Sequence, residues 1–130
     1  MITLVVTAAV ISRGGCFLVT RRQDGVHLAG TWEFPGGKCH PGEPLDVCMA
    51  REIREELAVD AEVGAEILMT THEYSDRAVE LHFLRCSIRG EPSPQQGQEM
   101  RWVTRLELQT LELPPADAEL VRILSEDRGT

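Results

Sequence analysis

The order of the predicted elements indicates a mixed β-sheet covered by helices. Segments rich in β-branched or alternating apolar residues predict strands before and after a central helix, and a second long helix follows near the end of the chain. Because strands and helices do not alternate regularly, an all-parallel sheet is not expected. The 130 residues are most simply one domain, residues 1–130, which is long enough to bury its own core.

The N-terminal region predicts a hairpin. Residues 2–12 are rich in β-branched side chains, which favours a strand that is mostly buried. Gly14 and Gly15 predict a tight turn, and residues 16–21 are expected to form the returning strand.

A glycine-rich loop is expected after this hairpin. A loop over residues 23–30 and a short strand over residues 31–34 lead the chain to Pro35, Gly36 and Gly37. Adjacent glycines allow backbone geometries that other residues resist, and they let a ligand come close to backbone carbonyls.

The central helix is expected to begin near Glu43-Pro44 and to end near Ala58. Pro44 suits the first turn, where its missing N–H costs little. Five apolar positions form one stripe of this helix: Val47, Met49, Ala50, Ile53 and Leu57.

Three carboxylates share another face of the same helix. Glu52, Glu55 and Glu56 are spaced i, i+3 and i+4, and their like charges repel unless the face is fully solvated or binds a cation. Mg²⁺ takes oxygen ligands and often binds one or two carboxylates together with substrate phosphates. A solvated charge cluster is the ordinary meaning of such a face, but the neighbouring glycines and Glu43 favour a metal site. Glu43 itself is assigned either a structural or a metal-binding role.

The second half of the chain supplies the remaining strands. They are predicted at residues 62–74, 78–87 and 99–103, with a turn at 75–77 and a loop at 90–98. Thr104 is expected to cap a short helical turn, and Pro114-Pro115 precedes a final helix over residues 116–126. The inward-facing residues of that helix are expected to be Leu120, Ile123 and Leu124.

Composition excludes several classes of partner. The formal net charge of −8 disfavours a polynucleotide, which would want a basic stripe, but not a small anionic ligand whose charge is met by a metal. No apolar run approaches about 18 residues, so no membrane span is expected. The apolar start lacks a basic n-region, so no signal peptide is expected and a cytoplasmic location is predicted.

The cysteines are scattered and form no CxxC pair. They are Cys16, Cys39, Cys48 and Cys86. Without a secretory signal, reduced thiols are expected rather than disulfides or a zinc site. The histidines at positions 40, 72 and 82 have no ligand-like spacing and are expected to be structural.

The central segment resembles the Nudix box, the signature of the Nudix hydrolases. The matching letters are, in order, Gly37, Glu43, Arg51, Glu52, Ile53, Glu55, Glu56 and Val59. The one departure is Ala58, where the family pattern has glycine. A glycine at a helix C-terminus commonly takes a left-handed conformation, so alanine is expected to alter that turn without removing a ligand.

Further segments look like the MutT branch of this family. They are Thr20-Arg21-Arg22, His27, residues 32–38, Ser75-Asp76-Arg77 and residues 113–117. The resemblance implies an α/β/α sandwich with a mixed sheet. It implies hydrolysis of nucleoside triphosphates to monophosphate and pyrophosphate with Mg²⁺, or Mn²⁺ as a substitute. It also implies that the chain removes 8-oxo-dGTP from the nucleotide pool, a function linked to DNA repair.

The resemblance also assigns metal-binding and catalytic residues. The metal ligands are expected to be Glu52, Glu55, Glu56, the carbonyl of Gly36 or Gly37, and Glu99 from a later loop. Glu52 is the first choice for the general base and Glu99 the second. Arg51 is expected to pair with Glu55 and to fix its orientation.

The substrate-binding residues are assigned in the same way. Lys38 and Arg22 are expected to bind phosphate, and Phe34 the base. Arg77 and His27 are expected to contact sugar, phosphate or the edge of the base. The choice of nucleotide is expected to depend on Phe34, Arg77 and Asp117.

Asp117 stands where MutT-type oxoguanine enzymes have asparagine. An ionised aspartate only accepts hydrogen bonds, which suits the exocyclic amine of cytosine or the N–H edge of guanine. A (d)CTP or modified-cytidine triphosphate pyrophosphohydrolase is therefore the alternative to 8-oxo-dGTP hydrolysis. Nucleoside diphosphate sugars and dinucleotide polyphosphates remain open as substrates. A non-catalytic nucleotide-sensing module ranks low because all the box carboxylates are present.

Overall fold

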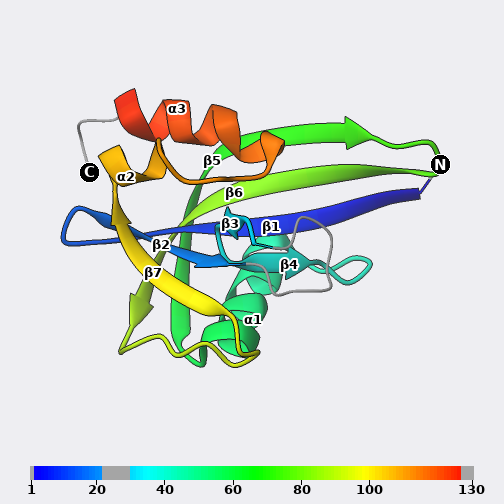
Figure 1. Cartoon of the computed structure of the whole chain (residues 1–130). Coiled ribbons are helices and arrows are strands. Elements are labelled where there is room, and N and C mark those ends of the chain that lie inside the picture. Colours follow the sequence, from blue (N-terminus) through cyan, green and yellow to red (C-terminus); the bar gives the residue numbers. More distant parts are fainter. Residues whose placement is uncertain (1, 22–29, 127–130) are drawn as a thin grey trace.

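The computed structural model describes residues 2–21 and 30–126 (Figure 1). Its strands are β1 (Ile2–Arg13), β2 (Cys16–Arg21), β3 (Trp32–Glu33), β4 (Gly36–Lys38), β5 (Asp60–Glu73), β6 (Arg77–Arg89) and β7 (Glu99–Thr104). Its helices are α1 (Leu45–Leu57), α2 (Arg105–Leu108), the 3-10 helix η1 (Pro115–Asp117) and α3 (Ala118–Glu126).

The strands form one mixed sheet. Its main order is β3-β2-β1-β6-β5, with β4 also paired to β1 and β7 also paired to β2. Strands β1 and β6 run parallel over ten registered pairs, from Ile2–Arg77 to Ile11–Cys86, whereas the other pairings are antiparallel. The predicted mixed sheet is confirmed.

Alternate residues of the central strand β1 enter two different cores. Ala8 and Val10 belong to a core that also holds the buried leucines of α2 and α3. Ala9 and Ile11 belong to a second core, which is closed by the apolar stripe of α1. Because successive side chains of a strand point to opposite faces, the two cores lie on opposite sides of the sheet. The result is the expected α/β/α sandwich, with α1 on one face and α2 and α3 on the other (Figure 1).

The expected glycine-rich loop is wrong, because Gly36 and Gly37 lie in the short strand β4 against β1. A Cβ atom on Gly36 would collide with the carbonyl oxygen of Thr7, and one on Gly37 would collide with the carboxylate of Glu52. The glycines therefore serve close approach of the backbone to its neighbours rather than an unusual turn.

The apolar stripe of α1 is confirmed at three positions and wrong at one. Met49, Ile53 and Leu57 are fully buried, but Val47 is 51% exposed. Cys48 takes the buried place in that first turn. The stripe prediction missed Cys48 because its partners come from β1 and from the preceding loop rather than from the core.

The expectation of four reduced thiols is wrong for two of them. Cys39 and Cys48 form a disulfide with their Cα atoms 5.3 Å apart, whereas Cys16 and Cys86 are free. The loop before α1 turns back at Gly42, whose φ is +76°, so that Cys39 reaches the first turn of the helix. A spacing of nine residues gives no hint of this contact.

The C-terminal part follows the sequence closely. Thr104 caps α2, and Glu107 completes a capping box with it. The final helix begins at Ala118, two residues later than expected, because residues 115–117 form the 3-10 turn. Arg77 belongs to β6, so the predicted turn at 75–77 is one residue shorter. Within the described ranges, no helix is long and apolar enough to cross a membrane.

Helix α1 ends on a left-handed alanine. Ala58 has φ +56° and ψ +35°, and its N–H donates to the carbonyl of Arg54 at 3.0 Å. Among the described residues it is the one non-glycine with positive φ. Chirality makes this conformation cost about 1–2 kcal/mol for an L-residue other than glycine.

Replacing Ala58 by glycine is expected to stabilise the protein. The relief of the left-handed conformation, less the extra entropy of glycine in the unfolded chain, leaves a gain of about 1 kcal/mol. Urea denaturation of Ala58→Gly measures it. The matched control is Ala50→Gly, inside the same helix, which is expected to lose about 1 kcal/mol. Equal losses in both variants would contradict the assignment of strain to Ala58.

Candidate active site

A cavity of about 710 Å³ opens between the sheet, β4 and η1. Six of its lining residues were expected in the site: Phe34, Gly36, Gly37, Lys38, Glu56 and Asp117. The cavity therefore brings Glu56, near the end of α1, together with Asp117 from the C-terminal part of the chain.

Two of the box carboxylates lie against the backbone of β4. The N–H of Gly36 donates to the carboxylate of Glu56, and the carboxylate of Glu52 lies directly against Gly37. Glu52 is only 13% exposed in its side chain, whereas the third carboxylate, Glu55, is 54% exposed. The close approach of β4 to α1 thus places backbone groups and carboxylates at one point.

Burial and neighbouring carboxylates favour the protonated form of Glu56. Burial, and then the charges of Glu52 and Glu33, raise the pKa of Glu56 to about 8, against a donated hydrogen bond from Gly36 that lowers it. At neutral pH this carboxyl group therefore retains its proton unless a cation compensates for the burial.

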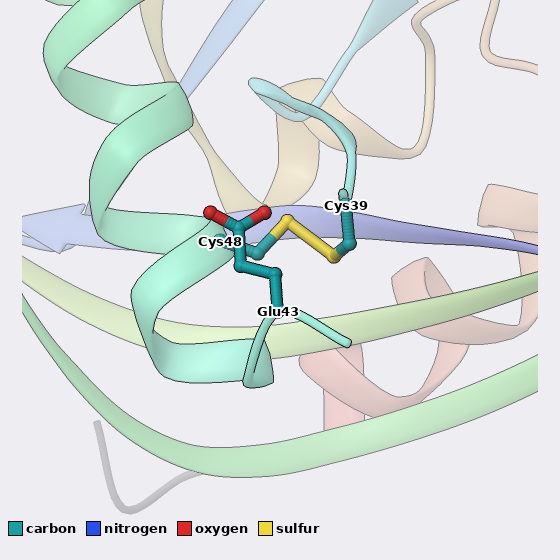
Figure 2. Close-up of side chains that lie close together, drawn as sticks. All are labelled: Cys39, Glu43 and Cys48. Atoms are coloured by element: carbon teal, nitrogen blue, oxygen red, sulfur yellow. A yellow bond between two sulfur atoms is a disulfide. The ribbon is translucent and has the colours of Figure 1, made fainter. Parts of the chain in front are cut away.

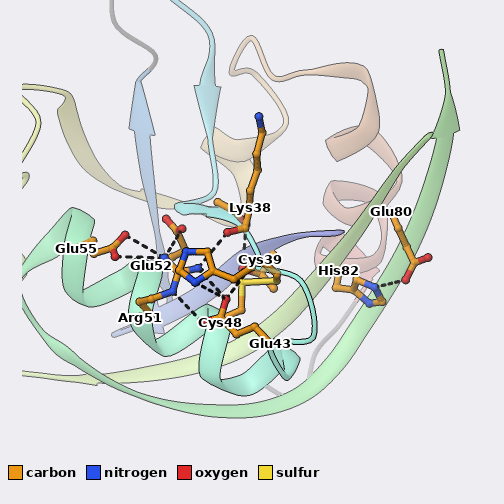
Figure 3. Close-up of a disulfide and its surroundings, with 12 residues drawn as sticks. Lys38, Cys39, Glu43, Cys48, Arg51, Glu52, Glu55, Glu80 and His82 are labelled. Carbon is orange, nitrogen blue, oxygen red and sulfur yellow. Dashed lines mark hydrogen bonds and ion pairs between the residues drawn. A yellow bond between two sulfur atoms is a disulfide. The ribbon is translucent and has the colours of Figure 1, made fainter. Parts of the chain in front are cut away.

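Arg51 is the centre of the polar network around these carboxylates (Figure 3). Its Nε and Nη2 donate to the two oxygens of Glu43 at 2.8 and 2.9 Å. Its Nη1 donates to Glu52 at 2.9 Å and to Glu55 at 3.1 Å. Its Nη2 also donates to the carbonyl of Lys38 at 3.1 Å. The predicted pairing with Glu55 is present. Arg51 also binds Glu43, Glu52 and the backbone of Lys38, which the sequence did not predict.

The contact with Arg51 controls the charge of Glu43. The hydrogen bond from Arg51, followed by the backbone N–H of His40, lowers the pKa of Glu43 to about 2. Glu43 in turn is the main cause of the raised pKa of Arg51. Since both oxygens of Glu43 bind Arg51, this geometry favours the structural role over the metal-binding role.

The donor set fits a divalent cation. Glu52 and Glu56 offer carboxylate oxygens and the neighbouring backbone of Gly36 and Gly37 offers carbonyls, the hard oxygen ligands that Mg²⁺ and similar ions take. The raised pKa of Glu56 comes first from its burial and then from the neighbouring charges of Glu52 and Glu33, and a bound cation would offset both effects. Glu55 is the most exposed carboxylate of the three.

The structure does not bring Glu99 to this group. Its carboxylate pairs with Arg21 at 3.3 Å, on the neighbouring strand β2. Gln98, the residue before it, lines the cavity and donates from Nε2 to the carbonyl of Glu56 at 3.5 Å. The sequence alone does not show which residue of this loop lies beside α1. In the structure that residue is Gln98 and not Glu99.

The far end of the cavity contains aromatic and polar side chains. Phe34 is 3% exposed and packs edge-to-face on Phe83, and Asp117 is 5% exposed. Sequence reasoning missed three lining residues: Thr70 and His72 in β5, and Tyr74 directly after it. Their spacing of two along a strand puts them on one face, which was a usable signal.

The structure places two of the remaining expected substrate residues, Lys38 and Arg77, in relation to the cavity. Lys38 lines the cavity, and its side chain extends away from α1 (Figure 3). The guanidinium of Arg77 lies 5.6 Å from the ring centroid of Tyr74, which lines the cavity. Arg22 and His27 lie outside the described residues.

Comparison with known proteins agrees with this site. Residues 6–122 match the NUDIX domain family. The CTP pyrophosphohydrolase of Escherichia coli strain K12 is 35% identical over 117 residues, covering 89% of this chain and 87% of that protein. A putative 8-oxo-dGTP diphosphatase 2 of Mycobacterium tuberculosis strain H37Rv is 37% identical over 136 residues, covering 96% and 93%. The solution structure of the E. coli ORF135 protein superimposes with a TM-score of 0.88 at 33% identity, covering 100% of this chain and 96% of that one.

The chain therefore belongs to the NUDIX domain family. Within it, the chain is a MutT-like Nudix hydrolase. Members of this family generally use a divalent metal, in agreement with the donor set around Glu52 and Glu56.

The metal-free protein is expected to lose stability as the pH rises. The folded pKa of Glu56, about 8, lies above its unfolded value of 4.5, so the folded state holds the extra proton between these values. The free energy of unfolding then falls by about 3 kcal/mol between pH 5.5 and 8.5, by linkage. Urea titrations in the presence of a chelator measure this slope.

The matched variant is Glu56→Gln, which cannot ionise but can still accept from Gly36. Burial lowers the pKa of His82, but the hydrogen bonds that its ring donates to the carboxylates of Glu66 and Glu80 outweigh this effect and raise the pKa overall, so His82 contributes a slope of the same sign. The difference between the pH slopes of the wild type and of Glu56→Gln is the contribution of Glu56 alone. Equal slopes would contradict the buried, protonated carboxyl group.

Proposed function

We propose that this protein is a Mg²⁺-dependent nucleoside triphosphate pyrophosphohydrolase that converts a (d)NTP to the (d)NMP and pyrophosphate. The observation that carries the proposal is that Glu52 and Glu56 both lie against the backbone of β4, and that Glu56 and β4 line a cavity large enough for a nucleotide. Mn²⁺ is the expected substitute for Mg²⁺. Residues 1–130 would act as one catalytic domain.

The chain's own residues divide the chemistry. Glu52, Glu55, Glu56 and a carbonyl of β4 would hold the cation, which when bound neutralises phosphate charge and lowers the pKa of bound water. Glu52 would accept the proton of the attacking water, while Arg51 holds its carboxylate in place. Glu99, the second choice for the general base, is less favoured, because its carboxylate pairs with Arg21 on β2.

The substrate would enter with its phosphates at the carboxylates and its base at the aromatic end. Lys38 borders the phosphate end, where an ammonium group can meet phosphate oxygens. Phe34 and Asp117 border the other end. Arg77 would approach from the turn between β5 and β6, and Arg22 and His27 keep the substrate roles implied by the family resemblance.

The first candidate substrate under this proposal is 8-oxo-dGTP, whose hydrolysis would sanitise the nucleotide pool and limit DNA damage. One relative is named for that nucleotide and another for CTP. The buried carboxyl group of Asp117 is the observation that favours the second candidate, a (d)CTP or modified-cytidine substrate, because a carboxylate accepts from the exocyclic amine of cytosine. A small nucleotide in the cytoplasm is the expected partner in both cases.

Glu52→Gln is expected to retain the fold and to lose turnover by at least about a hundredfold, the lower range for a general base. Glutamine keeps the shape of the side chain but cannot accept the proton. Pyrophosphate release from a nucleotide panel with Mg²⁺ measures the effect, and Glu62→Gln, on strand β5, is the control. An unchanged rate in Glu52→Gln would remove this residue from the mechanism.

Asp117→Asn is expected to shift the substrate ranking toward 8-oxo-dGTP. An amide both donates and accepts, whereas an ionised carboxylate only accepts. The measurement is kcat/KM for 8-oxo-dGTP, dGTP, dCTP and 5-methyl-dCTP in both proteins. An unchanged ranking would show that Asp117 does not select the base. Absence of Mg²⁺-dependent pyrophosphate release across the panel would instead favour a nucleotide-sensing module.

A further inference from the structure

A disulfide lies next to Glu43 (Figure 2) and beside the arginine network of the candidate active site (Figure 3). It joins Cys39, in the loop between β4 and α1, to Cys48, in the first turn of α1. Ligand-type atoms of Cys39, Glu43 and Cys48 all lie within 4.8 Å of one another. None of the roles assigned to the Nudix carboxylates requires this bond.

We propose that Cys39 and Cys48 form a reversible thiol–disulfide site whose oxidation state sets the affinity of the box carboxylates for a divalent cation. The bond is a covalent clamp between the loop and the helix. The proposal rests on the proposed hydrolase function only for its kinetic readout, because thiol content and metal affinity are measured without a substrate.

The clamp is connected to the carboxylates through Arg51. The loop that Cys39 anchors supplies two of the acceptors of this guanidinium, the carbonyl of Lys38 and the carboxylate of Glu43. The opposite side of the same guanidinium holds Glu52 at 2.9 Å. Groups that orient metal ligands in this way tune the affinity for the metal. Opening the disulfide frees the loop and loosens the support of Arg51.

The surroundings of the two sulfurs suit thiol–disulfide exchange. Cys39 is half-buried between two exposed residues, whereas Cys48 is fully buried. The sulfur of Cys48 lies 4.0 Å from Nη2 of Arg51 and 3.5 Å from the hydroxyl of Thr7. A positive charge and a hydroxyl donor at these positions stabilise a thiolate, and a stabilised thiolate is a better leaving group.

These positions define the order of the exchange with an external dithiol. A thiolate of the dithiol attacks the sulfur of Cys39, the S–S bond breaks, and Cys48 leaves as a thiolate beside Arg51. The second thiolate of the dithiol then attacks the mixed disulfide and releases Cys39. Two electrons pass to the protein, two protons complete its thiols, and the dithiol becomes a disulfide. A low-molecular-weight disulfide, such as oxidised glutathione, runs the exchange in reverse.

A soft metal ion is the competing use of the same three groups. Thiolates and carboxylates bind Zn²⁺. Here both oxygens of Glu43 already accept hydrogen bonds from Arg51, and the guanidinium lies next to Cys48. A cation at this position would be repelled by Arg51, and it would have to compete with Arg51 for the oxygens of Glu43. The geometry therefore favours the dithiol–disulfide pair.

The first test counts thiols in the full chain. After treatment with oxidised glutathione, alkylation under denaturing conditions is expected to label two of the four cysteines, Cys16 and Cys86, and mass spectrometry should find the linked peptides of Cys39 and Cys48. After dithiothreitol, all four should be labelled. Four labelled cysteines in both states would overturn the proposal.

The second test measures the Kd for Mn²⁺ of the oxidised and of the reduced protein. The electron paramagnetic resonance signal of unbound Mn²⁺ gives the free concentration at each step of the titration. The Kd is expected to rise about tenfold on reduction, the lower end of the range for lost partners of metal ligands. With nucleotide, the KM for Mg²⁺ should rise in parallel while kcat at saturating metal stays unchanged. Equal Kd values for Mn²⁺ in the oxidised and the reduced protein would show that the disulfide is purely structural, and would overturn the proposal.

Two variants separate the site from other effects of the reductant. Cys39→Ser is expected to have the weaker Mn²⁺ affinity with or without reductant, whereas Cys16→Ser should respond as the wild type does. If Cys39→Ser does not fold, the wild type compared in its two states decides alone. Stoichiometric Zn²⁺ binding by the reduced wild type, lost in Cys39→Ser, would assign a metal site instead. A redox-dependent Mn²⁺ affinity without hydrolysis of any nucleotide would retain this site and reject the proposed function.

Discussion

The guanidinium of Arg51 holds together the parts of the molecule on which the site depends. It lies where the loop before α1, the end of β4 and the acidic face of α1 meet, and it binds an acceptor from each of them. Its side chain is only 22% exposed, so solvent screens these contacts less than it screens a surface ion pair. Without this charge, the like charges on α1 would oppose both the helix and the approach of the loop.

A second constraint is the tight fit of β4 between β1 and α1. Gly36 and Gly37 let the backbone come so close to β1 and to Glu52 that a side chain at either position would collide with its neighbour. This fit brings the N–H of Gly36 to Glu56 and makes a cluster of oxygen ligands out of a strand and a helix. The same packing half-buries Glu56 and raises its pKa. The ionised form of Glu56 is therefore unfavourable in the folded protein until a cation binds beside it.

The loop between β4 and α1 links these two constraints to the redox state of the chain. Glu43 and Cys39 anchor the loop in different ways, one by charge and one by a covalent bond. In a reducing compartment the covalent anchor is expected to open, and oxidising conditions would close it.

The sequence by itself determined the mixed sheet covered by helices, the acidic face of α1 and the cap at Thr104, because periodicity and capping report neighbours along the chain. Only the tertiary structure decided which distant groups meet. It paired Arg51 with Glu43 on both carboxylate oxygens, placed Gln98 rather than its neighbour beside the box helix, and joined Cys39 to the first turn of α1. Such contacts depend on where a loop turns back and how a strand is registered, and no local pattern of residues carries that information.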